Sequence, residues 1–315
     1  MLKSILRWCI ILLTLLAVGP LLASLFRTLH DRDGGHAFTL LISDSPVKGI
    51  GYALALLAAA TIIGGITSAF FSLNSGLACI GLLFGWSAWQ LGTIDGIIRR
   101  FASSGVAGGG GGGSDLLILA LEAFLTCLAA AAIVHFCSLL AEKNQPRLPN
   151  HTPIPRPKGL RGVLFTDLPA PHDGSIAGPL IGSILAAMIA GGFMTALVAV
   201  TGLKGQTLFA TFIGGIAAGL AASHMARTFK ASVSVVTPIL AMGLLGLLAP
   251  IIAKFMHGGG GASIVDILNA DKLFPLVRPI SLDWATGALL GVPIGMSWAG
   301  VILDTRAVEQ PVANT

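Results

Sequence analysis

The chain has 315 residues, of which 54% are hydrophobic and only 10% are charged. Soluble globular domains carry about 25% charged residues, so this chain has too little polar surface to face water on all sides. Its net charge of +5 is small and is carried between the apolar runs, which argues against a nucleic-acid-binding surface. The composition therefore predicts an integral membrane protein, with the lipid bilayer as its main partner.

Apolar stretches about 20 residues long recur along the chain, and this is the length that a helix needs to cross the hydrocarbon core of a bilayer. They predict an all-α, polytopic transmembrane bundle of seven or eight spans, because the third stretch is barely long enough. The stretches are 7–26, 50–72, 76–94, 115–141, 179–203, 205–226, 231–255 and 284–303. The links "SLNS" and "GLKG" are so short that the second and third spans, and the fifth and sixth, are expected to form antiparallel hairpins.

The first stretch follows Lys3 and Arg7, as the apolar core of a secretory signal peptide would. Its run from Trp8 to Phe26 is longer than the usual core of about 7–15 residues. We therefore expect an uncleaved first span, with cleavage near Ala23 as the alternative.

The long segment between the fourth and fifth spans divides the chain into three parts. The parts are an N-terminal four-span half (1–141), a basic, proline-rich loop (142–178) and a C-terminal four-span half (179–315). The basic residues of the loop favour the cytoplasm, and an even number of spans then places both termini there, in a bacterial-type cytoplasmic membrane. These basic residues are Lys143, Arg147, Arg156, Lys158 and Arg161.

The centre of the loop, "PNHTPIPRPKG", is expected to be extended because proline fixes φ and removes a backbone donor. It is interpreted as a stiff connector, and the alternative is a docking strip for a protein partner over residues 143–161. Further along, "SIVDILNADKLF" has the capping and apolar spacing of a short amphipathic helix near 263–274, expected to lie at the membrane interface.

Two segments of the chain align without gaps at an offset of 127 residues. These are "LAAATIIGGITSAFF" (57–71) and "ILAAMIAGGFMTALV" (184–198), each with Ala-Ala, then Gly-Gly, then a hydroxyl residue. They belong to the second and fifth spans, which cross in opposite senses. The pattern suggests a weak inverted repeat, as in many secondary transporters, although spans rich in Ala, Gly and Ile also match by chance.

Six consecutive glycines, Gly108 to Gly113, precede the fourth span, and a shorter run occupies Gly258 to Gly261. A phosphate-binding P-loop needs a Lys followed by Ser or Thr after its last glycine, but here Ser114 and Asp115 follow directly. The runs are interpreted as flexible linkers outside the membrane, with Ser114 or Asp115 capping the fourth span.

Small residues repeat at four-residue spacing and predict smooth helix faces that let helix backbones approach closely. The faces are Gly178/Gly182/Ala186/Ala190, Gly81/Gly85, Gly215/Gly219 and Gly287/Gly291/Gly295. The Trp and Tyr residues lie near the proposed span ends, which suggests positions in the headgroup layer. They are Trp8, Tyr52, Trp86, Trp89, Trp284 and Trp298.

Ionisable residues inside a span are costly and mark a functional site by default. Glu122 lies about two turns into the fourth span, with Thr126 one turn further on the same face. His135 lies 13 residues beyond Glu122, about 20 Å along the helix axis, and His224 ends the sixth span. Glu122 is a candidate for a proton relay; the alternative is a carboxylate satisfied by Thr126, by a neighbouring span or by interfacial water.

Catalytic signatures of intramembrane enzymes, such as HExxH, GxGD or GxSxG, do not occur in the sequence. The segment "HDRDGGH" (30–36) could offer metal ligands but is also an ordinary turn, so no metal and no cofactor are expected. Two classes of function remain. The first is a non-catalytic component that anchors or assembles with other membrane proteins, and the second is a small-solute or ion-coupled transporter or channel.

Overall fold

The computed structural model describes residues 2–29, 38–43, 45–103, 111–144, 159–167, 177–256, 268 and 272–308. Its N-terminal helices are α1 (Leu2–Leu13), the π-helical turn η1 (Thr14–Val18), α2 (Gly19–Phe26), η2 (Arg27–Leu29), α3 (Pro46–Phe70), α4 (Leu73–Gln90), α5 (Ile94–Ser103) and α6 (Gly111–Asn144). The following elements are α7 (Leu160–Leu164), β1 (Phe165–Asp167), α8 (Ala177–Val198), α9 (Lys204–Thr228), β2 (Ser232–Val233), α10 (Val236–Met256), η3 (Pro275–Val277) and α12 (Ser281–Val308).

Seven helical segments within the described residues are long and apolar enough to cross a membrane. In one of them α1 continues through η1, α2 and η2, and in another α4 continues into α5. The predicted all-α, polytopic bundle is therefore confirmed. The eighth expected span, 284–303, corresponds to α12, which packs along α9 but is not among these seven.

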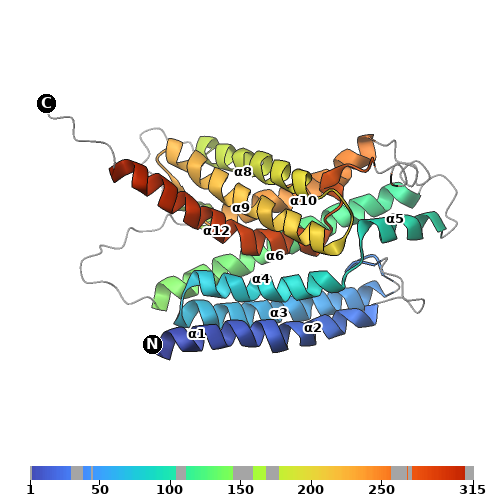
Figure 1. Cartoon of the computed structure of the whole chain (residues 1–315), viewed down its shortest axis with the longest axis horizontal. Helices are drawn as coiled ribbons and strands as arrows, with labels where there is room; N and C mark the ends of the chain where they lie inside the picture. Colours follow the sequence, from blue (N-terminus) through green and yellow to red (C-terminus); the bar gives the residue numbers. More distant parts are fainter. Residues whose placement is uncertain are drawn as a thin grey trace.

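The long helices run roughly along one direction, with α1–α4 on one side and α8, α9, α10 and α12 on the other (Figure 1). α6 crosses between the two sides and packs against both α3 and α10, while α12 packs against α4, α6 and α9. A single cluster of buried apolar side chains includes residues from both predicted halves. The start of α1 and the end of α12 lie at the same end of the bundle (Figure 1). The opposite end, where α3, α6, α9 and α12 begin, is called the Glu122 end below.

Two of the predicted smooth faces hold α9 and α12 together by direct contact of their backbones. A methyl group added at Gly219 would lie 2.5 Å from Val292 O, and one added at Gly291 would lie 2.8 Å from Ile216 N. Such distances leave no room for a side chain, so glycine is required on both helices. Gly81 and Gly85 likewise face α12, through Leu290 and Thr286 respectively.

The two predicted hairpins, α3–α4 and α8–α9, make equivalent contacts at the aligned positions. Gly76 packs against Ser68 and the carbonyl of Gly64, which would lie 2.7 Å from an added methyl group. Gly214 packs against Thr195 and the carbonyl of Gly191, and the corresponding distance is 2.8 Å. Ser68 and Gly64 align with Thr195 and Gly191 at the offset of 127 residues.

The correspondence extends to a third helix of each group. A methyl group added at Gly65 would lie 3.3 Å from Leu140 of α6, and one added at Gly192 would lie 3.2 Å from Leu245 of α10. α6 and α10 in turn pack against each other. Three consecutive long helices in each half therefore share one pattern of contacts while running in opposite senses, as an inverted repeat requires.

Residues 159–167 of the proline-rich loop form a part that packs on the bundle, which the sequence did not predict. β1 pairs antiparallel with β2, which follows α9. Ser234 N and Thr237 Oγ1 both donate hydrogen bonds to Leu164 O, at 2.9 and 2.6 Å. This part of the loop is therefore held against the turn between α9 and α10, whereas residues 145–158 and 168–176 lie outside the described residues.

Of the aromatic residues assigned to the headgroup layer, Trp284 belongs instead to the packed interior, and Trp86 is half-buried. Trp284 is only 1% exposed and packs against Gly246. Trp86 packs on Gly19, and its Nε1 donates a hydrogen bond of 2.9 Å to Leu15 O within the π-helical turn. π-helical turns loosen the regular pattern of carbonyl bonding, and here an indole N–H from α4 engages one of those carbonyls. Trp8, Trp89 and Trp298 are exposed, as the prediction requires.

In the glycine run before the fourth span, Gly111 to Gly113 form the start of α6 and are not a linker, whereas Gly108 to Gly110 lie outside the described residues. Ser114 and Asp115 consequently lie inside the helix, and the prediction that one of them caps it is wrong. Gly258 to Gly261 lie outside the described residues, as does most of the interfacial helix expected near 263–274. Among the described residues, α5 is an amphipathic helix, with Ile94, Ile97 and Ile98 buried.

Candidate functional site

The candidate site lies at the Glu122 end of the bundle, where segments distant in the sequence converge. Glu122 projects from α6, six residues after Leu116, where that span begins, and therefore about 9 Å along the helix axis. Its side chain is only 2% exposed. The non-helical segment 38–43 covers it, with Phe38, Thr39 and Leu40 all buried.

The Glu122 carboxylate accepts hydrogen bonds from both sides of the bundle. Oε2 accepts from Thr39 Oγ1 at 2.7 Å and from Leu41 N at 3.0 Å. Oε1 accepts from Leu40 N at 3.3 Å and from the hydroxyl of Ser281, the first residue of α12. Both oxygens are therefore engaged by donors of the chain itself, as a buried carboxylate requires.

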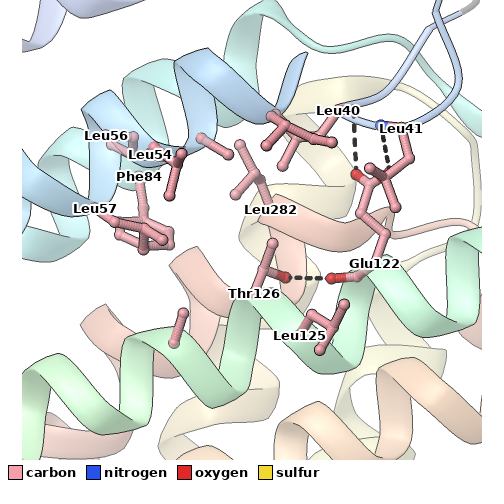
Figure 2. Close-up of a pocket in the computed structure, with 13 residues that line it drawn as sticks. Leu40, Leu41, Leu54, Leu56, Leu57, Phe84, Glu122, Leu125, Thr126 and Leu282 are labelled. Carbon is pink, nitrogen blue, oxygen red and sulfur yellow. Dashed lines mark hydrogen bonds between the residues drawn. The ribbon is translucent and has the colours of Figure 1, made fainter. Parts of the chain in front are cut away.

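Thr126 lies beside Glu122, as predicted, but does not bond its carboxylate. Its hydroxyl donates to the backbone carbonyl of Glu122 at 2.9 Å (Figure 2). It also donates to the backbone carbonyl of Ala123 at 3.0 Å. Of the predicted ways of satisfying Glu122, a neighbouring span is the one observed, through Ser281. The 38–43 segment is a further partner, which the sequence did not predict.

His135 and His224 do not belong to this site. His135 is half-buried on α6, 13 residues from Glu122, and its carbonyl accepts a hydrogen bond of 2.7 Å from Ser138 Oγ. His224 is exposed in the last two turns of α9. Of the residues singled out from the sequence, the structure brings together only Glu122 and Thr126.

A second charged group, missed by the sequence reasoning, lies at the starts of α9 and α12. Lys204 Nζ and Asp283 Oδ1 form an ion pair of 2.7 Å, and the two side chains are 11% and 1% exposed. Asp283 Oδ2 also accepts from Thr207 Oγ1 at 3.0 Å and from Ile280 N at 3.1 Å. The bond to Ile280 N is that of an acidic residue three positions after a helix N-cap, which fixes the start of α12.

The ion pair also reaches the first half of the chain. Lys204 Nζ lies 3.4 Å from Gly92 O, just beyond the end of α4. Ser281, which bonds Glu122, lies two residues before Asp283 at the start of α12. Glu122 and this pair are therefore parts of one group, called here the polar layer: Thr39, Glu122, Lys204, Thr207, Ser281 and Asp283.

The polar layer, together with the contact of Lys204 to Gly92 O, joins five separate parts of the chain. They are the 38–43 segment, the link that follows α4, the body of α6, and the starts of α9 and α12. Three charged side chains hold these parts together through hydrogen bonds and one ion pair. Within the described residues, no cluster of three or more His, Cys, Asp or Glu side chains could hold a metal ion. The segment 30–36, with its His and Asp residues, lies outside them.

Comparison of the chain with protein-family models, with curated proteins and with solved structures found no match.

Proposed function

We propose that this multi-pass membrane protein is a non-catalytic component that anchors or assembles with other proteins in the membrane. The observation that supports this most directly is the bonding of Glu122. Each of its carboxylate oxygens is engaged by two donors of the chain itself, including two backbone amides. A carboxylate bonded in this way fastens a loop to two helices and leaves no lone pair directed at a travelling ion.

The Lys204–Asp283 ion pair supports the same proposal. Asp283 is bonded by Lys204, Thr207 and a backbone amide, so its charge holds the starts of α9 and α12 in place. A buried ion pair with additional hydrogen-bond partners favours one arrangement of the helices that carry it. The pocket beside Glu122 has almost no polar wall, which is the opposite of a water-filled pathway.

The proposal is tested by cross-linking through the loop predicted to face the cytoplasm. A photoreactive amino acid is placed at Arg147 or Lys158 in the full chain, and a matched control is placed at Lys48, exposed at the Glu122 end. The proposal expects one defined protein adduct from the loop positions, none from Lys48, and its loss when 145–158 is replaced by a Gly/Ser segment of equal length. Equal adducts from all positions, or none from the loop, would overturn it.

A second candidate function, transport, is favoured by the equivalent contacts of the α3–α4 and α8–α9 hairpins. Inverted repeats form the framework of many secondary transporters, whose sites lie where the repeats meet. In proteoliposomes under an imposed potential, a transporter moves protons or sodium ions faster than empty liposomes do, and Glu122→Gln abolishes the flux while the variant still inserts. The assembly proposal expects no flux above the empty control for either protein.

A further inference from the structure

A pocket of about 160 Å³ lies between α3 and α6, beneath the 38–43 segment (Figure 2). α3 contributes most of its wall, and α6 contributes Leu125, Thr126 and Ala129. Leu40 and Leu41 form its cover, and the backbone amides of these two residues are the ones that bond Glu122. The shape of the pocket therefore depends on the Glu122 bonds.

One side of the pocket is formed by residues on the outer surface of the bundle. Ile50, Leu54 and Leu125 are 47%, 61% and 47% exposed, and all three lie in segments apolar enough to span a membrane. At the opposite side, Leu56 and Phe84 are 1% and 0% exposed. The pocket is therefore a lateral recess that passes from the lipid-facing surface towards the core.

The wall of the recess offers nothing to a polar ligand. Its two polar side chains are Glu122 and Thr126, and the other lining residues are Leu, Ile, Ala and Phe. The Glu122 carboxylate and the Thr126 hydroxyl are already bonded within the chain. A charged or hydrogen-bonding headgroup would find no partner here, whereas a hydrocarbon group gives up no hydrogen bond by entering.

The size and position of the recess fit part of a hydrocarbon chain. An apolar cavity of about 150 Å³ in a protein stays free of water and takes up a group as large as benzene. Here the surrounding solvent is the hydrocarbon of the bilayer, so the chains of neighbouring lipids are the groups that meet the exposed side.

We propose that this recess binds one acyl chain of a bilayer phospholipid, which enters between α3 and α6 and ends against Leu56 and Phe84. The chain lies under Leu40 and Leu41, and the lipid headgroup stays outside, at the Glu122 end of the bundle. The bound chain fills the space between the cover segment and the two helices and so stabilises the closed arrangement. Glu122 acts on this site as a positioning residue, because it holds the cover and does not touch the chain.

The test uses the full chain reconstituted in bilayers that contain a phospholipid with a photoreactive diazirine near the end of one acyl chain. After illumination, labelled residues are mapped by peptide mass spectrometry. The proposal expects labels at Leu56, Leu57 or Phe84. Lipids that merely surround the protein label exposed residues such as Ile62 and Leu185 instead.

Two variants that narrow the recess sharpen the test. Leu54→Trp blocks its open side, and Ala53→Phe extends a ring from its wall; both should abolish the interior labels while leaving those on exposed residues unchanged. Leu185→Trp, at a similarly exposed position of α8 (51% against 61% for Leu54), is the control and should leave the interior labels intact. Labels confined to exposed residues in the unaltered protein, or interior labels that persist in both narrowed variants, would overturn the proposal.

Discussion

Ser68 of α3 and Thr195 of α8 occupy equivalent positions in two hairpins that run in opposite senses. Each places its hydroxyl against a glycine of the next helix, Gly76 or Gly214, at the point where an added methyl group would also meet a backbone carbonyl. A contact between Cα–H and a hydroxyl oxygen contributes modestly, but close approach of two backbones gathers many dispersion contacts. The two helices of each hairpin are therefore held together by the same kind of contact, a glycine packed against a hydroxyl and a backbone carbonyl.

This equivalence predicts that Gly76→Ala and Gly214→Ala destabilise the protein alike. Each added methyl group meets a hydroxyl and a backbone carbonyl, and overpacking of this kind costs about 1–3 kcal/mol. Gly51→Ala in α3 is the matched control, because nothing lies within 4 Å of its added methyl group. Alanine also favours the helix there by about 1 kcal/mol.

Thermal unfolding in detergent, followed by loss of the monodisperse species, measures these effects. The melting temperature should fall in both hairpin variants and stay level or rise in Gly51→Ala. A large fall in melting temperature in only one of the two variants would show that the two equivalent contacts contribute unequally to stability.

The bonding of Glu122 leads to a second prediction, on the variants Glu122→Gln and Ser281→Ala. An amide in place of the carboxylate turns an NH₂ group towards some of the four donors, so buried groups lose their partner at about 1–3 kcal/mol each. Ser281→Ala removes one donor only and should cost less. Because the two residues bond each other, the double variant should be less destabilised than the sum of the single variants.

Limited proteolysis gives the readout that separates this loss from general destabilisation. If Glu122 fastens the 38–43 segment, Glu122→Gln should expose that segment to cleavage at temperatures where the rest of the bundle is intact. Uniform cleavage along the chain would instead indicate that Glu122 supports the whole fold evenly.

Much of the helical framework could be predicted from the sequence, because lipid imposes strong rules on span length and on small residues at helix contacts. The short links "SLNS" and "GLKG" fixed the hairpins, and the aligned Gly-Gly pairs pointed to positions that make equivalent contacts. Glu122 was identifiable because a lone carboxylate stands out in an apolar run. Trp284 was misjudged because an aromatic ring near the start of a helix fits both the headgroup layer and the core.

The partners of the site could not be predicted, and the reason is physical. Glu122 is bonded by the hydroxyl of Thr39 and by the backbone amides of Leu40 and Leu41, all more than 80 residues away in the sequence. Every residue except proline has a backbone amide, so no sequence pattern indicates such a bond. Lys204 and Asp283 stand near the ends of apolar stretches, where charges ordinarily face water. Only the re-entry of the 272–280 segment into the bundle, with Val277 and Ile280 buried, places Asp283 inside.

The ion pair gives a third prediction, in which single and double substitutions have opposite consequences. Lys204→Met leaves Asp283 buried without its counter-charge, and Asp283→Leu leaves Lys204 without its own. Removing one partner of a buried ion pair lowers the free energy of unfolding by about 3–5 kcal/mol. The double variant removes both charges and should recover a large part of that loss. A double variant that is as unstable as the sum of the two would contradict a direct pairing.

Trp86 supplies the last prediction, which concerns the N-terminal span. The bond from Trp86 Nε1 to Leu15 O engages a carbonyl of the π-helical turn, where the regular helical ladder is interrupted. Trp86→Phe keeps most of the ring against Gly19 but removes the donor, at a cost of about 1 kcal/mol. Trp89→Phe, one turn further along α4 and 55% exposed, is the control and should be nearly neutral. Hydrogen–deuterium exchange of 14–18 should accelerate only in the Trp86 variant. Equal exchange in both variants would mean that the indole bond does not stabilise the turn, because the helix then holds its irregular geometry through packing alone.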